Sequence, residues 1–281
     1  LQELIRANAL EDAKITAYHI GFVLGPCINA SGRLDTAARS LQLLNAQTIE
    51  EAAKLAGDLT ALNQSRKALT EKGKEEAIRL IETTDLKNDR VLVVYLPDCH
   101  ESLAGIIAGR LREKYHKPAF VLTRGETSAK GSGRSIESYS MYEELVKCAD
   151  LMVQFGGHPM AAGLSIKEEN IEAFRRQLNE NCTLTEENLR PKIVIDVPMP
   201  VSYITKELVE QISLLEPFGK GNTKPVFAQK GLRVLDSSIL GKNKNVVKVK
   251  LLDPQGVPME GIYFGEAEEF AGFLKEHDTI A

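Results

Sequence analysis

Apolar residues recur with helical spacing through the first eighty or so residues, which predicts a helical N-terminal region. A short helix is predicted over residues 1–9, and a much longer one from Thr48 to about Thr83. Thr48 and Glu51 have the spacing of a capping box at the start of the long helix. About 35 helical residues span roughly 50 Å, which suits a connector between two bodies. Gly73 lies inside this run and weakens the expectation of one unbroken helix.

A glycine-containing segment interrupts the helical pattern between these two helices. Residues 25–33 read Gly-Pro-Cys-Ile-Asn-Ala-Ser-Gly-Arg and are predicted to form a loop. Asp35 and Thr36 follow, and we expect them to cap a helix that runs to Leu44.

From about residue 89 the pattern changes to alternating strands and helices, which is typical of a small α/β domain. Apolar and glycine-rich runs predict the strands, and amphipathic spacing predicts the helices. The predicted strands are residues 90–96, 118–123, 128–136 and 162–166, and the predicted helices are residues 102–115, 141–154 and 168–181.

Beyond residue 183, short strands follow one another between turn signals. They are predicted at residues 192–197, 226–229, 231–240, 245–253 and 261–264, with one helix near residues 205–214. So many short strands in so short a stretch indicate a small OB-type β-barrel. The predicted fold class is therefore α/β plus all-β, with a long connecting helix, an α/β domain and an OB-type barrel in that order.

Composition and charge place the chain among ordinary globular proteins. It has 281 residues, of which 43% are hydrophobic and 26% are charged. The net charge is −4, which excludes a global basic field but leaves room for a local basic groove. The four cysteines form no CxxC pair, so free thiols in a reducing cytoplasm are expected. No apolar run approaches the ~20 residues that span a bilayer, and no signal peptide is recognisable, so no membrane contact is expected.

Glycine-rich segments are the first candidates for chemistry, because glycine inside a fold often marks a close approach of the backbone to something else. One is residues 25–33, and a second is Lys130–Ser135. In the second, backbone N–H groups, Ser132 and the Arg134 guanidinium have the chemistry to hold a phosphate. The alternative is an edge strand on which Arg134 faces water, and from this segment alone that is the favoured interpretation.

A third glycine-rich segment surrounds His158. Gly156 and Gly157 precede this histidine, and Ala161, Ala162 and Gly163 follow it closely. A histidine on a glycine turn among small residues leaves room for a ligand, and phosphate binding, metal binding and proton transfer all stay open. A tight structural turn under a helix is an equally good interpretation.

The run Asp98-Cys99-His100-Glu101 contains metal-ligating residue types. Adjacent residues on a loop seldom converge on one ion, and no spaced partner such as HxxxH or CxxC supports a metal site. A substrate contact by His100, just before a helix N-terminus that favours anions, is the better prediction. No metal site is predicted within the chain.

Four ordered segments resemble a known family. They are residues 25–33, 98–110 (DCHESLAGIIAGR), 130–136 (KGSGRSI) and 155–166 (FGGHPMAAGLSI), and their order and spacing resemble the RecJ family of single-strand-specific exonucleases, which are DHH phosphoesterases. The resemblance implies four parts: the end of a DHH domain at 1–47, a long connecting helix at 48–88, a DHHA1 domain at 89–183 and an OB-type domain at 190–281.

The resemblance implies 5′-to-3′ hydrolysis of single-stranded DNA in DNA repair and recombination. In the full-length enzyme the reaction would depend on Mn²⁺ or Mg²⁺, held by DHH motifs expected upstream of Leu1. The chain opens on Leu rather than Met, so we expect it to be the C-terminal, substrate-binding part of such an enzyme. On its own it is expected to hold no cofactor and to be inactive. The implied partners are single-stranded DNA, single-strand-binding protein and a helicase, in the cytoplasm.

The same resemblance assigns roles to individual residues. Ser132 and Arg134 match residues that hold the 5′ phosphate, and Asn29 and Arg33 match a motif that lines the nucleotide path. His158 matches a histidine that faces the metal centre, and it is the predicted catalytic residue. The predicted substrate-binding set is Asn29, Arg33, His100, Ser132, Arg134, Gly156 and Gly157.

Two positions depart from the family pattern. Cys27 stands where the family commonly has Arg, and Cys99 stands where Trp is frequent. One phosphate contact is therefore lost or supplied from elsewhere, and Cys27 is not predicted to be a site residue. In the OB-type region Lys242, Lys244, Lys248 and Lys250 are candidate phosphate contacts, with a solvated strand face as an equal alternative.

Two other functions remain open at this stage. One is a DHH-family phosphodiesterase that degrades oligonucleotides or cyclic dinucleotides, although such enzymes commonly stop before an OB-type domain. The other is a non-enzymatic nucleic-acid-binding module, which would suit the lack of a predicted metal site.

Overall fold

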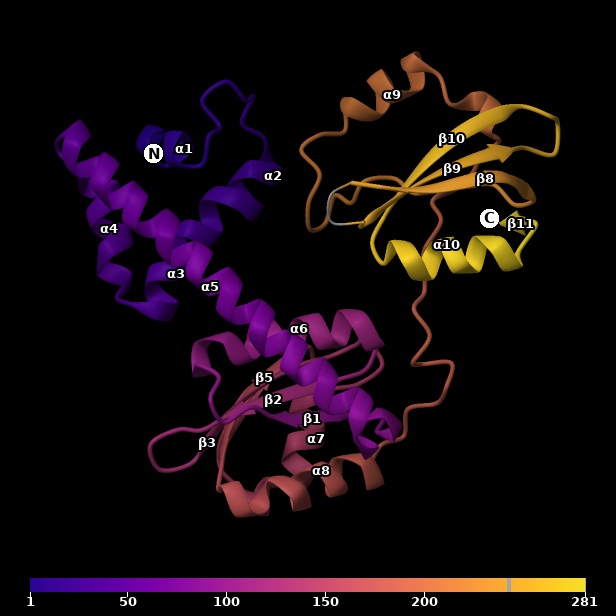
Figure 1. Cartoon of the computed structure of the whole chain (residues 1–281). Coiled ribbons are helices and arrows are strands. Elements are labelled where there is room, and N and C mark those ends of the chain that lie inside the picture. The colour runs from indigo at the N-terminus through magenta and orange to yellow at the C-terminus, as the bar shows by residue number, and fades with distance from the viewer. Residues whose placement is uncertain (242–243, 281) are drawn as a thin grey trace. The chain divides into compact units, whose positions relative to one another are not determined.

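The computed structural model describes residues 1–241 and 244–280, and the chain forms two compact units, Leu1–Pro191 and Lys192–Ala281. Figure 1 shows the two units, each with its own sheet. Within the described residues, no helix is both long enough and apolar enough to cross a bilayer.

The first unit begins with a cluster of helices. They are α1 (Gln2–Ala7), α2 (Ala17–His19), a π-helical turn (Ile20–Leu24), α3 (Gly25–Leu34) and α4 (Ala37–Asn45).

The prediction of a loop at residues 25–33 was wrong, because this segment is helix α3. Pro26 is compatible with the first turn of a helix, and Cys27 and Ala30 are fully buried, so packing overrides the weak helix propensity of the glycines. The predicted cap of α4 is present, since the Thr36 hydroxyl accepts a hydrogen bond from the backbone N–H of Ala38.

The predicted long helix is α5, which runs without interruption from Ile49 to Thr83. The Thr48 hydroxyl accepts from the backbone N–H of Glu51 at 3.2 Å, while the Glu51 carboxylate accepts from the N–H of Gln47. Gly73 does not break the helix. It is buried where α6 crosses, and a Cβ atom there would lie 2.6 Å from Cδ1 of Ile107. Glycine at this position lets the two helices approach closely.

A five-stranded sheet forms the body of the first unit, with strand order β1-β2-β3-β5-β4. β1 and β2 are parallel, and the other neighbouring strands are antiparallel. The strands are β1 (Leu92–Tyr95), β2 (Ala119–Thr123), β3 (Ala129–Arg134), β4 (Met152–His158) and β5 (Ala161–Ile166).

Helices cover both faces of this sheet, and each face has its own core. On one face α5 and α6 (Glu101–Tyr115) bury Ile81 and Ile107 against Leu92 and Val121. On the other face α7 (Met141–Lys147) and α8 (Ile171–Glu180) form a core that contains Phe120 and Phe174, together with Val93, Leu122, Met141, Leu145, Leu164 and Leu178. Short 3₁₀ turns lie at Asp85–Asn88, Ala149–Leu151 and Glu168–Asn170.

The helix predicted over residues 141–154 is shorter than expected. It ends at Lys147, and β4 begins at Met152. The segment around His158 is therefore the end of a strand rather than a glycine turn, and the turn of the hairpin falls at Pro159 and Met160. Alternation along β4 explains this, because Phe155 packs against the core while Gln154 and Gly156 are exposed.

The second unit is built on an open sheet with strand order β10-β9-β8-β11. Its strands are β8 (Leu232–Leu240), β9 (Val246–Leu252), β10 (Pro258–Phe264) and β11 (Thr279–Ile280), while β6 (Val197–Pro198) pairs separately with β7 (Phe227–Ala228). The unit also holds a 3₁₀ turn (Val201–Tyr203) and the helices α9 (Lys206–Ser213) and α10 (Ala267–Glu276). α10 covers one sheet face and buries Leu274 against Val247 and Leu251.

This second sheet is an OB-type half-barrel, so the predicted fold class is confirmed. Three details of the prediction were wrong. Most of the strand predicted at residues 192–197 is irregular, β10 begins at Pro258 rather than residue 261, and helix α10 was not predicted. Lys242 lies outside the described residues.

Candidate functional site

One face of the first sheet presents a small, regular surface made by β3, β5 and β4. The register pairs Lys130 with Ser165, Ser132 with Gly163, and Arg134 with Ala161 on β5. On its other side, β5 pairs with β4: Ser165 with Gln154, Gly163 with Gly156, and Ala161 with His158. Paired residues, and residues two apart on a strand, share a face. The surface, called the sheet floor below, is therefore Lys130, Ser132, Arg134, Gln154, Gly156, His158, Ala161, Gly163 and Ser165.

The floor is polar at both ends and nearly free of side chains in its middle row. Residues from all three of its strands line a cavity of about 490 Å³, which Glu101 and Ser102 of α6 also line. The intervening strand residues, such as Gly133 and Ala162, point to the opposite, buried face. The floor thus has a rigid core behind it and open space in front.

The glycines of these strands fall into two classes. A Cβ on Gly133 would lie 2.6 Å from the Phe120 ring, and one on Gly157, where φ is +155°, would lie 2.5 Å from the Ala161 carbonyl oxygen. These two glycines are required by the fold. A Cβ on Gly156 would meet nothing within 4 Å, and one on Gly163 would make only an ordinary contact. Their effect is to keep the middle of the floor flat.

Arg134 is held in place at one end of the floor. Its Nη1 donates to the Ser132 hydroxyl at 3.1 Å and to the Gly133 carbonyl oxygen at 2.7 Å. A Cβ on Gly105 of α6 would lie 2.8 Å from both Arg134 Nη2 and Ser132 Oγ. The missing side chain at Gly105 therefore makes room for the guanidinium between the helix and the floor.

A reciprocal pair of hydrogen bonds joins Arg33 of α3 to this site. Arg33 Nη1 donates to the Ser102 carbonyl oxygen, and the Ser102 hydroxyl donates to the Arg33 carbonyl oxygen, both at 2.9 Å. His100 is the N-cap of α6, with Nδ1 2.8 Å from Ser102 Oγ and accepting from the Ser102 N–H. His100 thus has a structural role at the edge of the site in addition to its predicted contact with substrate.

The electrostatics around Arg134 favour an anion. Burial, and then the nearby charge of Arg33, lower the pKa of the Arg134 guanidinium. Burial, Arg33 and Arg110 likewise lower the pKa of Arg66. Arginine stays protonated in proteins, so these shifts mean that positive charges are held together at a cost. Within the described parts of the chain, no carboxylate forms an ion pair with Arg33, Arg66 or Arg134.

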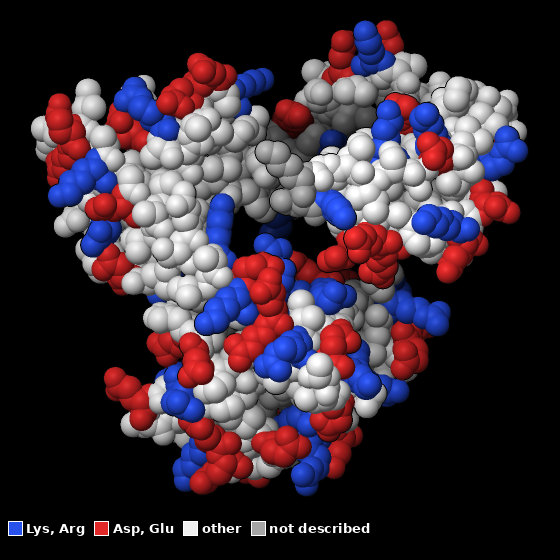
Figure 2. Space-filling model, viewed as in Figure 1, with Lys and Arg blue, Asp and Glu red and all other residues white. Residues whose placement is uncertain are grey.

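This concentration of positive charge is local. Figure 2 shows basic and acidic side chains interspersed over the visible face of the first unit, in keeping with the net charge of −4. A bound phosphate would offset the repulsion among these guanidinium groups. The local cluster is enough to attract it, and the chain needs no overall positive charge.

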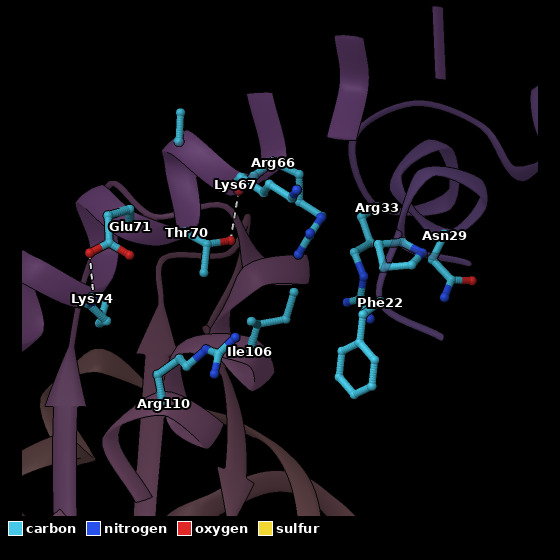
Figure 3. Close-up of a pocket in the computed structure, with 12 residues that line it drawn as sticks. Phe22, Asn29, Arg33, Arg66, Lys67, Thr70, Glu71, Lys74, Ile106 and Arg110 are labelled. Carbon is cyan, nitrogen blue, oxygen red and sulfur yellow. Dashed lines mark hydrogen bonds and ion pairs between the residues drawn. The ribbon is translucent and has the colours of Figure 1, made fainter. Parts of the chain in front are cut away.

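The structure brings together most of the residues that the sequence singled out. Ser132, Arg134, Gly156 and His158 share the floor, and Arg33 and His100 adjoin it through Ser102. Gly157 lies behind the floor, and exposed Asn29 lines a different cavity, together with Arg33, Arg66 and Arg110 (Figure 3). The sequence did not single out Gly105, Gly163, Arg66 or Arg110 as site residues, although three of the four lie within the quoted motifs.

Cys27, at the position where the family commonly has Arg, is fully buried among the N-terminal helices. Its sulfur accepts a hydrogen bond from Asn63 Nδ2 at 3.3 Å. Arg66 donates to Oδ1 of the same asparagine through Nε and Nη2. A guanidinium on α5 therefore lies two hydrogen bonds away from the Cys27 thiol.

The lysines proposed in the OB-type sheet are partly neutralised. Lys248 Nζ lies 2.9 Å from Glu260 Oε1, and this cation lowers the pKa of Glu260. Lys250 lies in register between Asp236 and Glu260. Phosphate binding by these lysines stays a prediction. The acidic side chains of Glu260 and Asp236 lie on the neighbouring strands and would compete with a phosphate for them.

Comparison with known proteins identifies two domains in this chain. Residues 88–183, which contain the whole sheet floor, match the DHHA1 domain, and residues 195–281 match the RecJ OB domain. The chain carries the paired domains of the RecJ family. The single-stranded-DNA-specific exonuclease RecJ of Bacillus subtilis is 34% identical over 274 residues, which cover 96% of this chain and 35% of that protein.

Solved RecJ structures are similar as well. The crystal structure of RecJ from Thermus thermophilus in complex with Mg²⁺ is 27% identical in sequence and superposes with a TM-score of 0.80. The match covers 94% of this chain and 40% of the Thermus thermophilus chain. The corresponding structure with Mn²⁺ has a TM-score of 0.75 at the same identity, with 94% of this chain and 39% of that chain covered. This chain spans between about a third and a half of the length of the RecJ proteins it matches.

The residues of the sheet floor do not form a suitable binding site for Mg²⁺ or Mn²⁺. Divalent Mg²⁺ and Mn²⁺ prefer several oxygen ligands, above all carboxylates. The floor offers the imidazole of His158 in the same row as the positive charge of Arg134, with Lys130 at the opposite end. Within residues 1–241 and 244–280, no group of three or more His, Cys, Asp or Glu side chains could hold a metal ion.

Proposed function

We propose that this chain is the substrate-binding region of a 5′-to-3′ single-stranded-DNA exonuclease. The sheet floor takes the 5′ end of the strand, and Arg134 with Ser132 binds its terminal phosphate. The observation that carries the proposal is the placement of Arg134. Its guanidinium is fixed against Ser132 by the gap at Gly105, close to the charge of Arg33, and no carboxylate among the described residues neutralises it.

The chemistry of the floor suits this ligand. A guanidinium offers two parallel N–H donors to a phosphate and binds a dianionic terminal phosphate more strongly than a monoanionic diester. The flat row at Gly156 and Gly163 lets a sugar–phosphate backbone approach the strands closely. His158, exposed at the other end of the Arg134 row, is proposed to donate a hydrogen bond to the phosphate at the reacting centre.

Metal chemistry belongs to the rest of the enzyme in this proposal. When bound, Mg²⁺ or Mn²⁺ activates the attacking water and stabilises the developing charge on phosphate oxygens. The residues of this chain position the strand, with the phosphate held by Arg134 and the DNA end oriented on the floor. The roles in DNA repair and recombination, the cytoplasmic location, and the partnership with single-strand-binding protein and a helicase are parts of the same proposal.

Binding of matched oligonucleotides tests this function. We expect the chain to bind a 5′-phosphorylated single strand more tightly than the same sequence in a blunt duplex, because the floor holds a free strand end. For a single strand, each phosphate neutralised adds about 0.7 to the slope of log affinity against log salt concentration. Fluorescence anisotropy at several salt concentrations measures both quantities. Equal affinity for the duplex, or an affinity independent of salt, would contradict the proposal.

A further inference from the structure

Helix α9 of the second unit exposes apolar side chains that contribute to no core. None of its residues is buried, and none belongs to an apolar core formed by the described residues. Figure 1 shows α9 and α10 on opposite sides of the second sheet, and of the two helices only α10 packs into the core of that unit. A helix of a globular protein normally buries one apolar stripe, so α9 lacks the packing partner that such a helix requires.

The exposed apolar residues lie on α9 and directly beside it. Val209, in the middle of the helix, is 55% exposed. Tyr203 and Ile204 precede the helix and Leu214 follows it, and they are exposed to a similar or greater extent. Ile204 and Val209 also line a groove of about 380 Å³ alongside the helix. Exposed apolar residues gathered beside a groove are typical of an interaction surface.

Two opposite charges line the same groove. Lys206 and Glu210 lie four residues apart on α9, so they share a helix face with Val209 between them. Among the described residues, neither of the two forms an ion pair. A lysine that precedes a glutamate is the less favourable order for a pair within one helix, and a lysine in the first turn is unfavourable at the positive end of the helix dipole. Both charges are therefore available to a partner.

The sequence of α9 is complementary to itself when two copies run antiparallel. A two-fold axis at the level of Leu208 brings Lys206 of each copy opposite Glu210 of the other, because both residues lie two positions from the axis. The two Val209 side chains then lie next to each other across the axis. The exposed apolar residues before one helix lie near the end of the other. Isologous pairs of this kind are the commonest form of protein dimer.

We propose that α9 is a dimerisation surface, on which the α9 helix of a second copy of this chain packs antiparallel. Val209 packs against Val209 of the other copy, and two Lys206–Glu210 ion pairs fix the direction and register of the helices. A helix of 8 residues with its flanks forms a small interface. The association is therefore weak, with a dissociation constant on the order of 100 µM. The dimer goes beyond the proposed function, because it uses no residue of the sheet floor.

Sedimentation velocity over a range of protein concentrations tests the dimer through the two charges. Lys206→Glu places two carboxylates opposite each other at both pairs, and Glu210→Lys places two ammonium groups there. Each variant alone should dimerise about tenfold or more weakly than wild type. An equimolar mixture of the two variants regains opposite charges at both pairs, so it should associate within about threefold of wild type. Lys275→Glu on α10 changes the net charge as much as Lys206→Glu and should have no effect.

Two further measurements test the apolar contact and locate it. Val209→Asp should weaken dimerisation about tenfold or more, because it places a carboxylate in the contact. Ile262→Asp, at a residue of β10 that is 50% exposed, is the matched control and should not weaken it. In methyl NMR spectra, the δ1 resonance of Ile204 should shift with protein concentration, while that of Ile262 should not.

Three results would overturn the dimer. The first is a wild-type chain that stays monomeric up to about 1 mM. The second is a pair of charge variants, folded by circular dichroism, that dimerise singly as well as wild type or fail to associate when mixed. The third is association in which the Ile262 resonance shifts and the Ile204 resonance does not, because the contact would then lie on β10.

Discussion

Gly105 shows how a single absent methyl group prepares a binding site. A Cβ there would lie 2.8 Å from both Arg134 Nη2 and Ser132 Oγ, whereas a Cβ on Gly109, one turn further along α6, would lie 3.9 Å from Arg134 Cγ. Gly109→Ala is therefore expected to raise the free energy of unfolding by about 0.5–1 kcal/mol through helix propensity alone. It should not change the affinity for a 5′-phosphorylated strand.

Gly105→Ala, by contrast, should weaken binding of the 5′-phosphorylated strand. The new methyl group displaces the guanidinium, and the loss of one charge-assisted contact lowers affinity for the phosphorylated strand about tenfold or more. Urea denaturation and oligonucleotide titration of both variants make the comparison. Equal phosphate affinity in Gly105→Ala and wild type would show that Arg134 is not positioned by this gap.

Residue by residue, local chemistry was easier to predict than tertiary placement. Ser132 and Arg134 lie in one short segment, so their shared role was visible in the sequence. Gly105 and Gly163 contribute through the space that they leave for neighbouring side chains. Those neighbours are set by the strand register and by the position of α6 on the sheet, which the sequence does not reveal. Arg66 lies outside the quoted motifs, and its proximity to Arg33 follows from helix packing that no spacing reports.

Helix α5 contains two glycines in contrasting environments. Gly57 is exposed, and a Cβ there would meet nothing within 4 Å, whereas Gly73 is buried against Ile107 of α6. We expect Gly57→Ala to stabilise the chain by about 0.5–1 kcal/mol. Gly73→Ala should instead destabilise it, because overpacking at a buried contact costs about 1–3 kcal/mol and exceeds the gain in propensity. Denaturant unfolding of the two variants measures the difference, and equal stabilisation by both would refute close packing at Gly73.

At the scale of elements, the predicted long helix, α6 and the central strands agree with the structure because their patterns are long or strongly apolar. The segment at residues 25–33 was assigned to a loop because glycine and proline dominate it, yet burial of Cys27 and Ala30 makes it helical. Helix α10 was missed although Ala267, Ala271 and Leu274 have helical spacing. Strand patterns predominate in that region, so the sequence predicts only one helix there, which corresponds to α9.

For the whole molecule, we expect no metal-dependent cleavage of DNA by this chain alone. Among the described residues no cluster of His, Cys, Asp and Glu could hold a metal ion, and the floor carries positive charge instead. The measurement is incubation of a labelled single strand with the purified chain and Mn²⁺ or Mg²⁺, followed by gel electrophoresis. Degradation that co-purifies with the chain and stops on chelation would contradict this expectation.

The central claim is that the floor recognises the 5′-terminal phosphate through Arg134. Its most direct test compares the affinity of the chain for 5′-phosphorylated and 5′-hydroxyl forms of one single-stranded oligonucleotide, in wild type, Arg134→Ala and Arg134→Lys. Wild type should prefer the phosphorylated strand by roughly ten- to a hundredfold, the range expected for a charge-assisted contact of about 1.5–3 kcal/mol. Arg134→Ala should abolish this preference, and Arg134→Lys should recover only part of it, because a point charge cannot make the two-pronged contact. A wild-type chain that does not distinguish the two ends, or a folded Arg134→Ala variant that still prefers the phosphate, would contradict the account.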